Sequence, residues 1–149
     1  MNTTTPQTES LWVLGHKVRP IPTEGNYGLV EIVSYPQVPG PPPHHHEGVS
    51  EFFYIIEGEL DVNVDGEWVR LGSGDTLSLK PGQVHTLMNR SEAPCRWLTG
   101  WNPGGFEAFF KEFGVGADQQ DAMEQSVSKE VIERVQAECE RFGMIVAAD

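Results

Sequence analysis

The sequence predicts an all-β domain followed by a short helical extension. Between Leu11 and Thr99 the apolar segments are short, often alternate with polar residues, and are separated by Gly, Pro, Asn and Asp. After Pro103 the apolar spacing changes to that of a helix. Many short strands at near-regular spacing are typical of a β-sandwich or barrel and not of alternating βαβ units.

The expected strands are each bounded by turn-forming residues. Asp65-Gly66 is a two-residue hairpin signal, because Asp-Gly tolerates the positive φ of a type I′ turn. Gly72, Gly74 and Gly82 separate the later strands in the same way. The strands predicted in chain order are Leu11–Val18, Tyr27–Tyr35, Glu51–Ile56, Glu59–Val64, Trp68–Leu71, Thr76–Lys80, His85–Asn89 and Cys95–Trp101.

Two helices are expected in the C-terminal extension. Four phenylalanines share one face of the first, which Gly114 and Gly116 end; they are Phe106, Phe109, Phe110 and Phe113. A polar connection over Val115–Gln125 leads to a second helix, which begins near Ser126 or Ser128 and ends at Phe142 before Gly143. We expect the aromatic face to cover the open end or the outside of the β body, or a partner subunit.

Composition excludes several classes of partner. Lys and Arg number 10 and Asp and Glu 22, so the net charge of −12 disfavours nucleic acid and anionic membranes. No apolar run approaches the ~20 residues of a membrane span, and residues 1–10, expected to form a flexible tail, lack the pattern of a secretory signal. We therefore expect a soluble cytoplasmic protein. Cys95 and Cys139 are expected to be reduced, mostly buried thiols.

The candidate functional side chains are histidines and one glutamate. His44-His45-His46 follows three prolines, which impose an extended backbone, so His44 and His46 point to one side and His45 to the other. Glu51 shares a strand face with Phe53 and Ile55. A carboxylate among large apolar groups needs a partner, because a buried unpaired charge is costly. A metal ion held together with two imidazoles would supply that partner.

A fourth candidate ligand lies further along the chain. His85 shares a face with Leu87 and Asn89 on the strand after the Lys80-Pro81-Gly82 turn. Three imidazoles and one carboxylate suit Fe, Mn, Ni, Cu or Zn, and leave two positions open on a six-coordinate ion. Taken singly, a loop histidine is usually exposed, so no special role is expected for His16 or His45.

These residues resemble the two motifs of the cupin superfamily. His44-x-His46, four residues, Glu51, six residues and Gly58 match the first motif from its histidines onward. Gly74, Gly82, His85 and Asn89 keep the register of the second. Two turn positions depart from the pattern: Gly40 lies closer to His44 than expected, and Pro81 lies one place late. Neither departure moves a ligand position.

The resemblance implies a double-stranded antiparallel β-barrel (the cupin jelly roll) over residues 11–102. A helical extension over residues 103–149 would pack on this barrel. The implied metal ligands are His44, His46, Glu51 and His85. Cupins often pair, so a homodimer is expected, with Leu11–Val18 able to add to a neighbour's sheet edge. The segment Pro103–Phe110 resembles small cupins similar to quercetin 2,3-dioxygenase.

We therefore predict a dioxygenase dependent on one divalent transition metal, with Fe, Mn or Ni favoured and Zn or Cu as alternatives. The substrate is expected to be a flavonol-like or other enolisable aromatic molecule. Glu51 would act as ligand and general base, and Phe53, Leu87 and Trp97 would line the substrate pocket. The alternatives are an oxygen-independent isomerase, cyclase or decarboxylase, and a non-catalytic small-molecule-binding domain.

Overall fold

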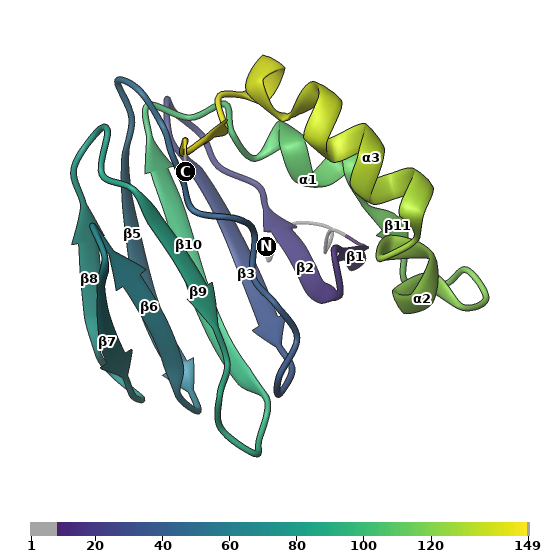
Figure 1. The fold of residues 1–149 in the computed structure, drawn as a ribbon, viewed down its shortest axis with the longest axis horizontal. Coiled ribbons are helices and arrows are strands. Elements are labelled where there is room, and N and C mark those ends of the chain that lie inside the picture. Colours follow the sequence, from purple (N-terminus) through teal and green to yellow (C-terminus); the bar gives the residue numbers. More distant parts are fainter. Residues whose placement is uncertain (1–8, 149) are drawn as a thin grey trace, which may run out of the picture.

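The computed structural model describes residues 9–148 and consists mainly of two antiparallel sheets. The first has the strand order β11 (Val115–Gly116), β1 (Leu11–Val13), β2 (His16–Ile21), β3 (Gly28–Ser34), β10 (Cys95–Asn102), β5 (Ser50–Glu57) and β8 (Thr76–Leu79). The second has the order β12 (Ile145–Val146), β4 (His44–His45), β9 (His85–Met88), β6 (Leu60–Val64) and β7 (Glu67–Leu71). The predicted all-β class is confirmed (Figure 1).

Alternation along the central strands forms the core between the sheets. On β3, buried and partly exposed residues alternate without interruption, and β2 and most of β5 show the same period of two. Phe53, Ile55, Leu60 and Val62 are fully buried where the two sheets face each other. Polar side chains on the inward strand faces, including His44 and His85, also point toward the interior.

The prediction of one strand over Leu11–Val18 is wrong. Leu14 and Gly15 have φ of 48° and 86°, and this left-handed pair forms the turn of a β1–β2 hairpin. The amide of Gly15 donates a 3.0 Å hydrogen bond to the Ser126 hydroxyl, which ties the turn to the C-terminal extension. Because β1 pairs with both β2 and β11, its two edges are occupied within the chain. The expected addition of this strand to a neighbour's sheet is therefore not supported.

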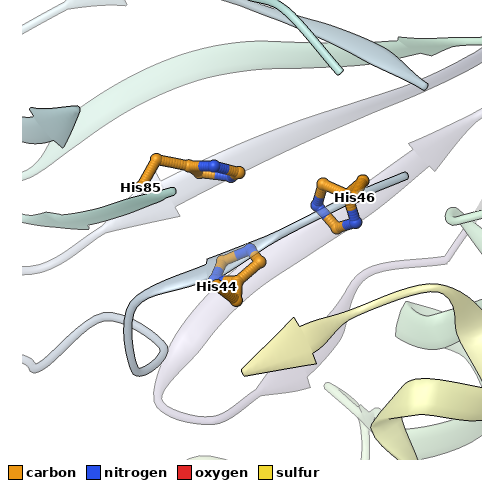
Figure 2. Close-up of side chains that lie close together, drawn as sticks. All are labelled: His44, His46 and His85. Carbon is orange, nitrogen blue, oxygen red and sulfur yellow. The ribbon is translucent and has the colours of Figure 1, made fainter. Parts of the chain in front are cut away.

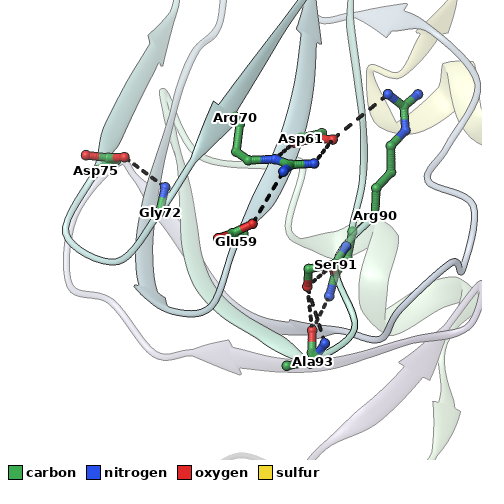
Figure 3. A network of polar contacts seen from close by, with 9 residues as sticks. Glu59, Asp61, Arg70, Gly72, Asp75, Arg90, Ser91 and Ala93 are labelled. Carbon is green, nitrogen blue, oxygen red and sulfur yellow. Dashed lines mark hydrogen bonds and ion pairs between the residues drawn. The ribbon is translucent and has the colours of Figure 1, made fainter.

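The hairpin predicted at Asp65-Gly66 is confirmed. Asp65 and Gly66 have φ of 51° and 92°, and they connect β6 to β7 with Val64 opposite Glu67. On the outer face of this hairpin, Arg70 donates hydrogen bonds of 2.8 and 3.1 Å to the two oxygens of Asp61 (Figure 3). The pair fixes the register of β6 against β7 on the side away from the core.

The C-terminal extension forms the short helix α1 (Ala108–Phe113), followed by α2 (Ala122–Ser126), α3 (Lys129–Glu138) and the 3₁₀ turn η1 (Cys139–Phe142). The expected polar connection over Val115–Gln125 is wrong in part, because β11 and the start of α2 lie within it. Ser128 caps α3 by accepting from the Val131 amide, as predicted. The second predicted helix corresponds to α3 and η1. Its α-helical part ends at Glu138, the 3₁₀ turn follows, and Gly143 ends that turn in the left-handed conformation.

The helices gather on one side of the sandwich, beside β1 and β11 (Figure 1). Phe109, Phe110 and Phe113 of α1 are buried there, so the aromatic face covers the β body as expected. Cys95 and Cys139 are buried free thiols, as predicted. Among the described helices, none is long and apolar enough to cross a bilayer. Most of the predicted flexible tail, residues 1–8, lies outside the described residues.

Candidate metal centre

Three histidines converge in the interior: His44 on β4, His46 directly after it, and His85 on the neighbouring strand β9. His44 and His46 are both 5% exposed, whereas His45 between them is more exposed, so the predicted alternation is confirmed. His85 lies on β9 directly opposite His44 in register. The ligand atoms of His44, His46 and His85 all lie within 4.8 Å of one another, and Figure 2 shows the three rings grouped together.

Each of the three rings donates its Nδ1 hydrogen to a main-chain carbonyl. The acceptors are Pro42 for His44 at 2.9 Å, Gln83 for His85 at 3.0 Å, and Gly143 for His46 at 2.9 Å. Because a carbonyl oxygen only accepts, each Nδ1 must carry the hydrogen, and the neutral ring then has a bare lone pair on Nε2. Such outer hydrogen bonds orient imidazoles for metal binding through Nε2.

Glu51 lies beside this histidine cluster. Its side chain is 7% exposed, and its Oε1 atom lies 3.2 Å from Nε2 of His85 and 3.5 Å from Nε2 of His46. The Thr99 hydroxyl, on the adjacent strand β10, donates a 2.8 Å hydrogen bond to the other carboxylate oxygen, Oε2. Thr99 therefore fixes the orientation of the carboxylate and leaves Oε1 directed at the imidazoles.

The electrostatics of the site depend on burial and close packing. Burial raises the pKa of Glu51, but the two histidines at Oε1 outweigh it and lower the pKa to about 2. Burial and then the neighbouring His85 lower the pKa of His44 to about 3. Burial also lowers the pKa of His85, yet the Glu51 carboxylate outweighs this effect and leaves it raised.

The donor set fits a transition metal. Nε2 of His46 and Oε1 of Glu51 are buried and have no hydrogen-bond partner within the described chain. With hydrogens on the Nδ1 atoms, the lone pairs of the cluster and of Glu51 face one small volume, where they repel each other unless a cation lies between them. Three imidazole nitrogens and one carboxylate oxygen are a mixed set that Fe, Mn, Ni, Cu or Zn accepts.

A mostly apolar cavity of about 90 Å³ opens onto the cluster. Phe53, Leu87 and Trp97, the residues predicted to bind substrate, all line it. Its remaining side chains come from β1 to β3, β10 and the C-terminal extension, and include Val13, Val18, Ile32, Thr99, Trp101, Phe106, Phe110 and Met144. An apolar wall around a few converging polar groups is the usual composition of a small-molecule site.

Sequence reasoning missed several residues of this site. His16, expected to have no special role, is buried at 8% exposure and lines the cavity. Its Nε2 donates to the Pro39 carbonyl, and its Nδ1 accepts from the Ser34 hydroxyl at 2.9 Å. The available signal for its burial was the spacing of two between His16 and the apolar Val18, which places both side chains on one strand face. Phe106 also belongs to the site, because its ring centroid lies 4.4 Å from that of His46. This contact depends on how the C-terminal extension folds back, and no pattern of neighbouring residues in the sequence indicates it.

The two facing sheets define a jelly-roll domain, and the histidine cluster between them has the spacing of a metal site. Residues 32–101, just under half of the chain, match the Cupin_2 family, described as a cupin domain. The RmlC-like cupin from Shewanella frigidimarina superposes with a TM-score of 0.58 at 21% identity, covering 70% of this chain and 92% of that one.

Two curated relatives match a similar share of the chain. The tetracenomycin polyketide synthase protein TcmJ of Streptomyces glaucescens is 36% identical over 74 residues, which are 50% of this chain and 48% of that protein. Quercetin 2,3-dioxygenase of Bacillus subtilis is 35% identical over 72 residues, 48% of this chain and 21% of the enzyme. The alignments thus span about half of the first relative and a fifth of the second. Other matches include both oxidoreductases and a transcriptional regulator.

Proposed function

We propose that this cupin is a metal-dependent dioxygenase of small enolisable aromatic molecules, with His44, His46, His85 and Glu51 as ligands of one divalent transition ion. The observation that carries the proposal is the set of unpartnered buried lone pairs, on His46 and Glu51, at the end of an apolar cavity. The similarity to quercetin 2,3-dioxygenase supports oxygen chemistry. Fe, Mn and Ni are the favoured ions, with Zn or Cu as alternatives.

A bound ion would supply Lewis acidity that lowers the pKa of a substrate hydroxyl and, if redox-active, a route for electron transfer to dioxygen. Glu51, on loosening from the ion, would take the substrate proton on Oε1, the oxygen that Thr99 does not hold. Thr99 keeps the carboxylate oriented while that proton is accepted. Phe53, Leu87 and Trp97 exclude water, and the rings of Phe53 and Trp97 present flat surfaces to a planar substrate.

Cavity size favours a single-ring substrate over a flavonol. About 90 Å³ is well below the roughly 300–1,000 Å³ of pockets for drug-sized ligands. A hydroxylated or enolisable ring with small substituents matches the space better than a three-ring flavonol. We propose that the protein acts in the cytoplasm as a homodimer on this class of molecule.

The test combines metal analysis with oxygen uptake. Protein purified without added metal or a His tag is analysed for transition metals, and oxygen consumption is then followed with gentisate and with quercetin as small and large probes. We expect a substantial fraction of one equivalent of a redox-active ion and faster oxygen uptake with the small probe. Glu51→Gln should abolish uptake, and Glu57→Gln, on the same strand but exposed, is the control.

The alternatives give different results in the same experiment. Conversion of a probe without oxygen uptake, persisting in the absence of air, would identify an oxygen-independent isomerase, cyclase or decarboxylase. Retention of a probe without any conversion would identify a binding domain. Less than a tenth of an equivalent of metal would overturn the metal-dependent proposal altogether.

A further inference from the structure

The strand that carries His44, and that His46 directly follows, is itself very short. β4 contains only His44 and His45, and a two-residue strand has little stability of its own. On one side it pairs with β9, where His44 lies opposite His85. On the other side it pairs with β12, with Ile145 opposite His45 and Val146 opposite His44. The C-terminal strand therefore completes the support of the histidine segment.

Main-chain hydrogen bonds beyond the strand extend this support. The amide of Ala147 donates to the Pro43 carbonyl at 2.8 Å, just before the histidines. At the other end, the amide of Gly82 donates to the His46 carbonyl at 2.9 Å. The histidine segment is thus held between the turn before β9 and the last strand of the described chain. The last strand lies outside the residues 32–101 that match the cupin family.

Gly143 contacts the histidine cluster directly through its main chain. Its carbonyl accepts the Nδ1 hydrogen of His46 at 2.9 Å, across 97 positions of sequence. Gly143 has φ of +92°, a left-handed conformation that ends η1, and its amide donates back to Cys139 and Glu140. The direction of the carbonyl is therefore set by the way the helical extension ends.

We infer that Gly143 is a positioning residue for His46: its carbonyl selects the Nδ1-protonated ring and so keeps Nε2 available to a metal ion. The inference rests on the proposed metal site and adds to it a part of the chain outside the family match. The orientation of His44 and His85 uses carbonyls only two residues away in sequence, Pro42 and Gln83. His46 alone among the three depends on a distant segment, which makes the end of the extension a component of the site.

Substitutions at Gly143 separate backbone conformation from side-chain volume. A Cβ at this position would meet no atom within 4 Å, so a clash does not confuse the result. Gly143→Val disfavours the left-handed conformation and should displace the carbonyl, whereas Gly143→Asn tolerates that conformation and should keep it. Co(II), titrated into metal-free protein against a competing chelator, is the probe. We expect Gly143→Val to weaken Co(II) binding by about 10-fold or more, since loss of such outer contacts costs about 10–100-fold.

A spectroscopic measurement keeps the inference testable if Gly143→Val does not fold. Long-range ¹H–¹⁵N correlation spectra of the metal-free wild-type protein report which nitrogen of the neutral His46 ring carries the hydrogen. A hydrogen on Nδ1 in the wild type and in Gly143→Asn is expected. A hydrogen on Nε2 in the wild type, or a folded Gly143→Val variant that binds Co(II) as tightly as the wild type, would overturn the inference.

The two proposals fail in different ways. If the wild type does not bind Co(II), the metal-dependent function fails, and the tautomer of His46 in the metal-free protein still decides whether the Gly143 carbonyl selects it. If the wild type binds Co(II) and Gly143→Val does so equally well, the metal site stands and the positioning role of Gly143 does not.

Discussion

Replacing Thr99 by Val removes one hydrogen bond at the candidate metal centre and changes little else. The two side chains have nearly the same shape, and Thr99 is 1% exposed, so no water replaces the lost hydroxyl easily. The Glu51 oxygen that accepts from Thr99 at 2.8 Å is then left without its donor in a buried position. A hydrogen bond to a charged group contributes about 1.5–3 kcal/mol.

That free energy determines the first of two expected effects. In the metal-free protein, we expect Thr99→Val to lower the free energy of unfolding by about 1.5–3 kcal/mol. The carboxylate also loses the contact that directs Oε1 at the imidazoles. Because loss of a contact that orients a metal ligand typically costs about 10–100-fold in affinity, Co(II) binding should weaken by that amount. Urea unfolding measures the first effect, and Co(II) titration against a chelator measures the second.

Thr99→Ser is the matched control. It keeps the hydroxyl and loses one methyl group, which costs about 1 kcal/mol through burial alone. Co(II) affinity within threefold of the wild type is expected for this variant. The reasoning is refuted if Thr99→Val and Thr99→Ser bind Co(II) equally tightly, because the hydroxyl of Thr99 then does not orient Glu51.

Three further predictions concern pH, substrate size and the outer face. The metal-free protein should lose stability most steeply below pH 4.5, measured by urea unfolding between pH 3.5 and 7. The pKa of His44 is lowered to about 3 and that of Glu51 to about 2, so the unfolded chain takes up both protons first. Near pH 6.5 and above, the raised pKa of His85 opposes the loss, because the folded protein there holds a proton that the unfolded chain releases; a flat profile between pH 3.5 and 6 would contradict this. Phe106→Ala should enlarge the cavity and improve the binding of quercetin relative to gentisate by about tenfold, the discrimination that one or two methylene groups provide. An unchanged ratio of the two dissociation constants would show that this ring does not limit the cavity. Asp61→Asn should cost about 0.5–1 kcal/mol, less in 1 M NaCl, because its partner Arg70 is 58% exposed; a larger cost in high salt would argue against an ion pair.

The sequence predictions were most accurate where one face of a strand is buried, because the period of two then shows which side chains point inward. The shared face of His44 and His46, and that of Glu51 and Phe53, could be predicted because successive side chains of an extended chain point to opposite faces. The Asp65-Gly66 hairpin could be predicted because few residue pairs tolerate its positive φ. These features depend on local backbone geometry, which neighbouring residues determine.

The errors occurred where distant segments decide the local conformation. Leu14 takes a positive φ that its own residue type does not favour, and the hydrogen bond from Gly15 to Ser126 of the extension accompanies it. His16 becomes a buried, fully hydrogen-bonded side chain only because Ser34 and Pro39 lie beside it. Neither contact is visible in a window of neighbouring residues.

The sequence by itself determined which side chains face inward and that three histidines and a glutamate fit a cupin pattern, because strand parity and turn chemistry are local. Only the tertiary structure decided which atoms of those side chains are available. Thr99 orients one oxygen of Glu51, and the Gly143 carbonyl, 97 positions away, holds Nδ1 of His46. Hydrogen bonds of about 3 Å between segments so far apart exist only after the sheets and the C-terminal extension have packed.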